Sequence, residues 1–335
     1  MLAKARQLFS LPAKAIGIQN LLRLTQNKLI LPFYHTVSDS PLPHIAPLYR
    51  HKTIREFKND LEFLLKNFQP VSLQDVDLHI KGVKEITKPS FHLSFDDGLQ
   101  EIYSTVLPVL KEKGIPATLF VNPAFVDNKR LFFRHKAALL IDKLEKKGFH
   151  RISTPKDNKA KEWEQLILTA QYHQETRLDE LGILLEVDFN EYLEKKHPYL
   201  SIGELKRLSL NGVEIGAHSI DHPEYQYISL DEQLRQTKES MSWVKEHFNP
   251  KVNAFSFPFT DFGVGNKFFE ILENDINYPV LFFGTAGHKT ELNANHLQRI
   301  PIETSTKNAS SVIASEMLSS LLKKGIGKSV ITRTA

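Results

Sequence analysis

The sequence predicts an α/β protein in which parallel strands form a sheet or barrel with helices on the outside. Strand-like apolar runs alternate with helical patterns over residues 29–121, a charged helical stretch then interrupts this alternation, and the alternation resumes near residue 201. The 335 residues exceed the usual size of one domain, but an α/β barrel runs to roughly 250 residues or more as a single unit. We therefore expect one main domain that carries an inserted helical segment.

Each half of the chain supplies its own set of strands. The first half is expected to hold a strand at 29–34, a helix at 53–68, strands at 71–73 and 91–95, a helix that stops at Gly114 and a strand at 117–121. The second half is expected to hold strands at 213–217, 252–257, 280–283 and 300–302. Three helix starts carry a Ser or Thr followed three residues later by Glu, at Thr53, Ser201 and Ser229, which is the pattern of a capping box.

The helical insertion is expected over about residues 127–200. Its apolar residues recur at helical spacing in two groups, 163–170 and 178–185, among many charges. They are too few for a full independent core, so we expect the segment to pack on the rim of the main domain. The remaining organisation is a basic amphipathic segment at 1–27, a main domain at 28–305 and a basic tail or helix at 306–335.

Positive charge is concentrated at the two ends. Residues 1–30 contain five basic side chains and residues 317–335 contain four, and neither stretch contains an acidic one. Of the 43 basic residues this leaves 34 against 39 acidic ones, a net charge of −5 over 31–316. Such a body does not favour nucleic acid as a partner. The basic ends allow either a helix packed on the body or a peripheral contact with an anionic membrane.

Composition excludes several kinds of site. The chain has no Cys, so any metal must be held by His, Asp or Glu. No apolar run reaches the roughly 18 residues that a membrane-spanning helix needs. Pro12, Lys14 and Arg23 interrupt what would be the apolar core of a secretory signal. We therefore expect a cytoplasmic protein that can lie peripherally on the inner membrane.

Two groups of titratable residues follow expected strands. Asp96 and Asp97 come after the strand at 91–95, and His218 and His222 come after the strand at 213–217. Catalytic groups collect at the carboxyl ends of strands in α/β folds, and two His four residues apart can bind one cation. The aspartates also fit a helix cap before a turn glycine, and each histidine alone also fits a structural role. Together, one Asp and two His leave open positions on a metal, as a hydrolytic site requires.

The residues around these groups resemble the polysaccharide deacetylases, known as the NodB-homology family or carbohydrate esterase family 4. The matching stretches are 94–98 (Ser-Phe-Asp-Asp-Gly) with Pro108 and 114–120, 214–222 with both histidines, 254–259 (Ala-Phe-Ser-Phe-Pro-Phe) and 297–302 (Leu-Gln-Arg-Ile-Pro-Ile). The similarity covers roughly residues 28–305 without the insertion.

This resemblance implies a distorted (β/α) barrel and a metal-dependent hydrolase that removes N-acetyl groups from an amino-sugar polysaccharide or its precursor. Carried over by position, Asp97, His218 and His222 would bind a divalent metal, commonly zinc. Asp96 would be the general base that activates the metal-bound water. The backbone at Pro258 and Phe259 would bind substrate by helping to hold the oxyanion of the tetrahedral intermediate.

The sequence departs from the family pattern in two places. Ser256 stands where the third motif often has an Arg that steadies the base, and Arg299 is the candidate to replace that Arg. Arg299 is also predicted to be a substrate-binding residue, together with Pro258 and Phe259. The late Leu-x-His motif that supplies the general acid is absent from the C-terminal part. His35, after Tyr34, resembles the early Tyr-His of a circularly permuted branch that includes the poly-β-1,6-N-acetylglucosamine deacetylases. This implies that His35 is the general acid.

Two other functions remain open at this stage. The same site can hydrolyse another small amide, as in related amidohydrolases of this fold. Alternatively, the chain is a carbohydrate-binding or scaffolding protein with a degenerate site, although the intact set of two Asp and two His argues against this reading. The sugar, its linkage and the choice between polymer and precursor do not follow from the sequence.

Overall fold

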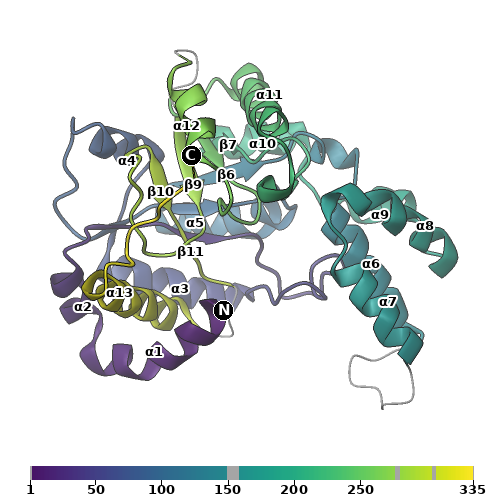
Figure 1. Cartoon of the computed structure of the whole chain (residues 1–335), viewed down its shortest axis with the longest axis horizontal. Helices are drawn as coiled ribbons and strands as arrows, with labels where there is room; N and C mark the ends of the chain where they lie inside the picture. The colour runs from purple at the N-terminus through teal and green to yellow at the C-terminus, as the bar shows by residue number, and fades with distance from the viewer. Residues whose placement is uncertain (1, 149–157, 276–279, 304–306, 335) are drawn as a thin grey trace.

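The computed structural model describes residues 2–148, 158–275, 280–303 and 307–334, and its centre is a parallel sheet of eight strands (Figure 1). The order across this sheet is β10-β9-β8-β7-β6-β5-β2-β11. The strands are β2 (Pro32–Tyr34), β5 (Leu93–Phe95), β6 (Ala117–Val121), β7 (Val213–Ala217), β8 (Asn253–Ser256), β9 (Val280–Gly284), β10 (His296–Gln298) and β11 (Ile300–Pro301). All neighbouring pairs are parallel.

One stretch of chain forms both edges of this sheet. β10 and β11 are separated only by Arg299; β10 pairs with β9, and β11 pairs with β2. The Arg299 N–H donates to the Gly284 carbonyl at 3.1 Å, and the next N–H, from Ile300, donates to Leu31 at 2.8 Å. The sheet therefore closes on itself, and the expected (β/α) barrel is confirmed.

A second, three-stranded sheet extends the amino-terminal end of the barrel. It is formed by β1 (Leu29–Ile30), β4 (Ser90–Phe91) and β3 (Gln69–Pro70) in the order β1-β4-β3. The predicted strand at 71–73 is wrong, because Ser72 is the N-cap of helix α4 (Leu73–Ile80). Its hydroxyl accepts the Asp75 N–H, and the Asp75 carboxylate accepts the Ser72 N–H. This capping box outweighs the apolar character of the run.

Helices surround the barrel, and most of them begin at predicted caps. They are α3 (Ile54–Asn67), α5 (Leu107–Lys113), α10 (Ile202–Leu210), α11 (Leu230–Phe248) and α12 (Asn266–Glu273). Thr53 and Ser201 form complete capping boxes, and the Ser229 hydroxyl accepts the Glu232 N–H. These bonds satisfy backbone groups that a helix start otherwise leaves free.

The first two helices pack against the last helix on one side of the barrel. Helices α1 (Leu2–Ile16) and α2 (Ile18–Thr25) both pack on α13 (Ala309–Gly325) (Figure 1). Ala13, Leu21 and Leu22 join the buried cluster that also contains α13 residues. No helix in the described ranges combines the length and the apolar character that crossing a bilayer requires.

A group of helices projects from the barrel at the right of Figure 1. It consists of α6 (Phe133–Lys146), α7 (Asn158–Leu168), α8 (Glu175–Leu185) and α9 (Phe189–Lys196). Their buried apolar residues form a cluster that also includes Leu42 and Ile45, from the loop after β2, and Leu99, from the loop after β5. The helical group therefore shares its core with loops at the carboxyl end of the barrel.

Candidate active site

The predicted site residues converge where the parallel strands end. Asp96 and Asp97 follow β5, His218 follows β7, and His35 follows β2. These residues line one cavity of about 920 Å³ together with His222. A barrel places the carboxyl ends of all its strands on one face, which explains how positions so far apart in the sequence meet.

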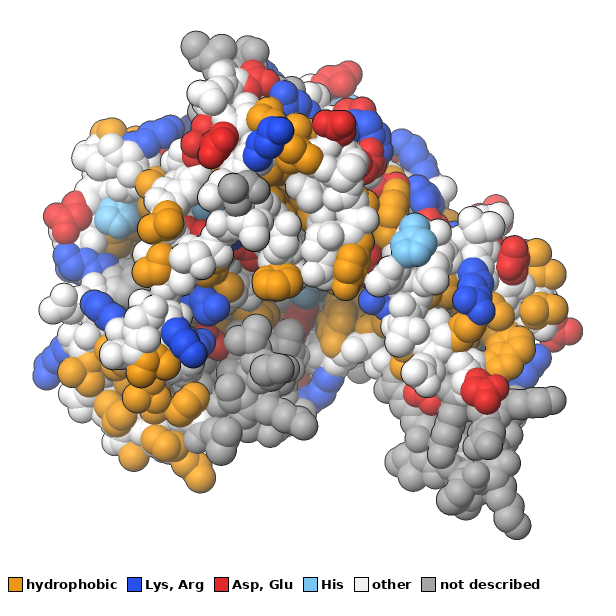
Figure 2. All heavy atoms as spheres, in the orientation of Figure 1, with side chains coloured by type: hydrophobic (Ala, Val, Ile, Leu, Met, Phe, Trp, Pro, Cys, Tyr) orange, Lys and Arg blue, Asp and Glu red, His pale blue; other side chains and the backbone are white. Residues whose placement is uncertain are grey.

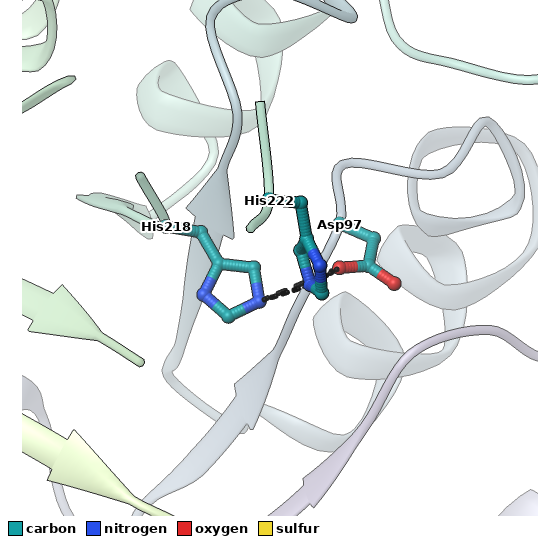
Figure 3. Close-up of side chains that lie close together, drawn as sticks. All are labelled: Asp97, His218 and His222. Atoms are coloured by element: carbon teal, nitrogen blue, oxygen red, sulfur yellow. Dashed lines mark hydrogen bonds and ion pairs between the residues drawn. The ribbon is translucent and has the colours of Figure 1, made fainter. Parts of the chain in front are cut away.

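Asp97, His218 and His222 form a compact buried group (Figure 3). His222 Nε2 lies 3.2 Å from His218 Nε2 and 3.2 Å from Asp97 Oδ1, and His218 Nε2 lies 3.4 Å from the same oxygen. The three ligand atoms lie within 4.8 Å of one another. One carboxylate and two imidazoles in this arrangement are the donor set of a catalytic zinc-type site with open positions.

The protonation of this group fits a cation rather than a set of hydrogen bonds. His218 Nδ1 lies 2.7 Å from the Ser256 carbonyl, so Nδ1 carries the proton and Nε2 presents a lone pair to the group. A single proton on His222 Nε2 cannot serve both of its neighbours. Asp97 Oδ1 is buried without a hydrogen-bond partner in the described ranges. A divalent ion would satisfy all three atoms.

Electrostatics keep the group in its metal-binding form. Burial raises the pKa of Asp97, but His222 and the other nearby histidines outweigh burial and hold this pKa well below its usual range. Burial lowers the pKa of His222, which favours the neutral imidazole. The backbone here is also strained, since Asp97, Ser219 and His222 have φ values of 72°, 64° and 65°. Such left-handed non-glycine residues cluster at functional sites.

Arg299 lies beneath Asp96 and holds it. Its Nη1 and Nη2 donate to the two Asp96 carboxylate oxygens at 2.8 and 2.7 Å, and Nη2 also donates to the Ser256 hydroxyl at 2.6 Å. Burial raises the pKa of Asp96, but Arg299 outweighs burial and the net shift is downward, so Asp96 is ionised at neutral pH.

This geometry corrects the prediction that Arg299 is a substrate-binding residue. The side chain is fully buried, with the guanidinium 4.1 Å from the Phe33 ring centroid, and it does not line the cavity. Residue 299 is the point where the chain crosses from β9 to β2, so its side chain enters the closed barrel. The geometry instead matches the replacement role, with Ser256 completing the contact.

His35 pairs with a residue that the sequence analysis missed, Glu303. The His35 backbone N–H donates to Glu303 Oε1 at 2.8 Å, and His35 Nδ1 contacts the same oxygen. Burial lowers the pKa of His35, but Glu303 outweighs burial and raises this pKa to about 9. Glu303 comes directly after the predicted strand at 300–302, so the rule that located Asp96 and Asp97 would also have found it.

The inserted helical group forms one wall of the cavity. Phe132, Arg134, His135 and Leu168 all line it, although the sequence analysis assigned the insertion no part in the site. The His222 ring lies between two aromatic rings, with centroid distances of 4.4 Å to Phe132 and 4.6 Å to Phe259. These two contacts restrict the orientation of the His222 imidazole.

Of the two predicted oxyanion residues, Phe259 lines the cavity and Pro258 does not. Phe259 is 38% exposed and has a φ of 56°. Pro258 is buried. Of these two residues, only Phe259 therefore lies at the cavity.

A second acidic cluster lies outside this cavity. Asp261, Glu291 and His296 lie close enough to hold an ion, but Arg333 fills that place and contacts Asp261 Oδ2 at 2.5 Å and Glu291 Oε1 at 2.6 Å. His296 is the first residue of β10 and is 3% exposed.

Comparisons with known proteins place this architecture in a family. A profile for polysaccharide deacetylase matches residues 84–177 and 189–272. Among curated protein sequences, none matches the chain.

Solved structures are similar in fold at low sequence identity. The deacetylase PplD of Streptococcus pyogenes, solved with acetate, has a TM-score of 0.56 at 15% identity, over 88% of this chain and 97% of that one. IcaB of Ammonifex degensii has a TM-score of 0.55 at 18% identity, over 86% and 97%. A de-N-acetylase of Aggregatibacter actinomycetemcomitans has a TM-score of 0.53 at 12% identity, over 85% and 98%. With more than half of its residues matched by the family profile, this chain belongs to the polysaccharide deacetylase family.

Proposed function

We propose that this deacetylase removes N-acetyl groups from an amino-sugar glycan with the help of a divalent metal, and that the metal is zinc. The observation that carries the proposal is one cavity that brings together a metal-type Asp-His-His group, an ionised carboxylate and a protonated imidazole. The Aggregatibacter protein of similar fold is a de-N-acetylase, which supports the choice of an amide as the bond to be cleaved.

Asp97, His218 and His222 are the residues that would hold the metal. A bound zinc ion would polarise the acetyl carbonyl and lower the pKa of water. The chain contains no Cys, and two imidazoles with one carboxylate suit zinc better than they suit magnesium or calcium, which prefer oxygen ligands.

Asp96 is the general base in this proposal. It is ionised and lines the cavity, and His218 Nε2 lies 3.9 Å from its Oδ2. A water molecule that attacks the acetyl carbon can give its proton to this carboxylate. Arg299 keeps the carboxylate aimed at that place through its two hydrogen bonds.

His35 is the general acid. Its Nδ1 is engaged by Glu303, which leaves Nε2 as the nitrogen that can donate a proton into the cavity. With a pKa of about 9 the ring is protonated at neutral pH. When the C–N bond breaks, this proton passes to the leaving nitrogen, so the products are acetate and a free amino sugar. Asp96 then releases its proton to solvent and His35 takes one up from solvent, so both groups return to their starting state.

Acetate release from N-acetylglucosamine oligomers tests this function. We expect release by the purified chain, loss of release with a chelator, and recovery on addition of zinc. Turnover of a ring amide without acetate release from any sugar would show that the same site hydrolyses another amide. Binding of the oligomers without any hydrolysis would instead favour a carbohydrate-binding protein.

A further inference from the structure

The fold brings the acid-free helices of the N-terminal end beside the basic last turn of α13 on a single surface, which we call the terminal face. It consists of the outward sides of α1, α2 and α13 together with the residues that follow α13 up to Lys328. Because α1 and α2 pack on α13, Lys14, Arg23 and Lys324 lie on neighbouring helices. Neither residues 1–30 nor residues 317–335 contain an acidic side chain.

The terminal face exposes large apolar side chains as well as charge. Leu11 of α1 is 79% exposed, Leu24 of α2 is 60% exposed, Leu322 of α13 is 49% exposed, and Ile326 directly after α13 is 67% exposed. Figure 2 shows hydrophobic side chains gathered with Lys and Arg over these helices, at the lower left. Such residues are normally scattered singly over a surface rather than gathered on one face.

The basic side chains of this face are available to a partner. Lys14, Arg23, Lys324 and Lys328 are exposed, and no ion pair joins them to any described residue. Acidic side chains among the described residues therefore do not neutralise these four positive charges of the terminal face.

We propose that the terminal face is a docking surface for an anionic lipid membrane. Apolar side chains that insert at the headgroup boundary, together with Lys and Arg that contact anionic headgroups, are the combination that holds a protein on such a surface. The face is made of whole helices packed on the barrel, so binding needs no unfolding. It is separate from the cavity residues, so membrane binding and hydrolysis can be measured independently.

Co-sedimentation of the full chain with lipid vesicles tests this proposal. We expect binding to vesicles of phosphatidylcholine mixed with phosphatidylglycerol, weak binding to pure phosphatidylcholine, and loss of binding as salt increases. Replacing Lys324 and Lys328 by Glu should reduce the affinity for anionic vesicles by about 5-fold or more per charge. The paired substitutions Leu322→Ser and Ile326→Ser should also reduce it.

The matched control is Lys206→Glu with Lys245→Glu, which reverses two exposed charges on α10 and α11. This control should bind anionic vesicles like the unmodified chain, and all variants should hydrolyse a soluble oligomer at the unmodified rate. Equal binding to neutral and anionic vesicles, or undiminished binding by the Lys324→Glu, Lys328→Glu variant, would overturn the proposal. So would a dimer in solution that the Leu322→Ser, Ile326→Ser variant dissociates, since the face would then belong to a second copy.

Discussion

At the scale of single residues, we expect the His35–Glu303 pair to set the alkaline limit of the reaction. The folded-state pKa of His35 is about 9, above its ordinary value of 6.5, so the ring carries a proton at neutral pH and loses it as pH rises through about 9. We therefore expect turnover to fall on the alkaline side near pH 9. By the same linkage, the pair stabilises the fold fully below pH 6.5, and this stabilisation is lost as pH rises through 9.

The Glu303→Gln variant tests whether Glu303 raises the pKa of His35. Without the carboxylate, the pKa of His35 should fall and the alkaline limb should move to lower pH. His35→Gln should reduce turnover by roughly 10²- to 10⁴-fold while metal binding survives. A pH–rate profile of both variants decides the matter; an alkaline limb that stays in place in Glu303→Gln would remove His35 from the role of acid.

Among substitutions inside the barrel, those that break the Arg299–Asp96 pair should have the largest effects on stability and activity. Arg299→Met leaves a buried carboxylate without its cation, so the free energy of unfolding should fall by about 3–5 kcal/mol and the pKa of Asp96 should rise. Arg299→Lys should also lose activity, because a lysine cannot make the two parallel bonds. Denaturant unfolding and turnover measure these effects, and a Met variant of unchanged stability would contradict this description.

His135 lines the cavity, and we expect it to donate a hydrogen bond to the substrate. The Tyr199 hydroxyl oxygen accepts the Phe132 N–H at 3.0 Å and lies 2.6 Å from His135 Nδ1, and its hydrogen has no other acceptor among the described residues. The Tyr199 O–H therefore donates to Nδ1. Because burial holds the pKa of His135 well below its usual range, the ring is neutral and keeps its proton on Nε2.

We expect His135→Leu to raise the KM for oligomers by about 5- to 10-fold with little change in kcat, the worth of one lost hydrogen bond. His135→Gln, whose amide keeps a donor near Nε2, should restore most of the affinity. Steady-state kinetics with both variants is the measurement. An unchanged KM in the Leu variant would show that substrate does not reach this wall.

These residues also show what sequence reasoning reaches at this scale. Asp96, Asp97 and His218 were predicted as site residues because they follow recognisable strands, and His222 because it stands four residues after His218. The role of Asp96 as general base came only from the family resemblance. Glu303 was missed although the same rule applied to it. His135 was out of reach, since its protonation depends on Tyr199 and Phe132, which contact it only in the folded insertion.

At the scale of elements, the segment after α13 fastens a loop of the active site. Arg333 Nη1 donates to the carbonyls of Asp261 and Val264, at 2.8 and 3.2 Å, in the loop that begins at Phe259. Arg333→Met would leave the acidic cluster buried without a cation. We expect the free energy of unfolding to fall by about 3–5 kcal/mol and kcat/KM to fall as Phe259 loses its support.

The matched control is Arg235→Met on the exposed side of α11, where the ion pairs with Glu232 and Glu239 lie in solvent. Exposed pairs contribute about 1 kcal/mol or less, so this variant should stay close to the unmodified chain in stability and activity. Equal losses in the two variants would show that Arg333 has no special role.

Local signals explain which elements were predictable. The caps at Thr53, Ser201 and Ser229 are short-range hydrogen bonds, so their sequence pattern is sufficient. The residue pattern alone did not predict β10, because its three residues, His-Leu-Gln, have no strand pattern of their own and form a strand only by pairing with β9. The use of the insertion as a cavity wall also arises from long-range packing.

At the scale of the whole molecule, closure of the barrel is what assembles the site. The stretch 296–301 pairs with β9 and then with β2, and this crossing delivers Arg299 to Asp96 and Glu303 to His35. Periodicity predicted an α/β sheet or barrel, and only the resemblance implied a closed one. Closure depends on pairing between residues more than 200 positions apart, such as Pro32 and Ile300, which no local pattern encodes.

The most direct test of the account combines metal titration with acetate release on one set of proteins. The unmodified chain should bind one divalent ion in its cavity group and release acetate. Asp96→Asn should still bind the ion but release almost no acetate, whereas His222→Gln should lose affinity for the ion itself. Acetate release that persists in Asp96→Asn, or that is indifferent to removal of the metal, would contradict the account.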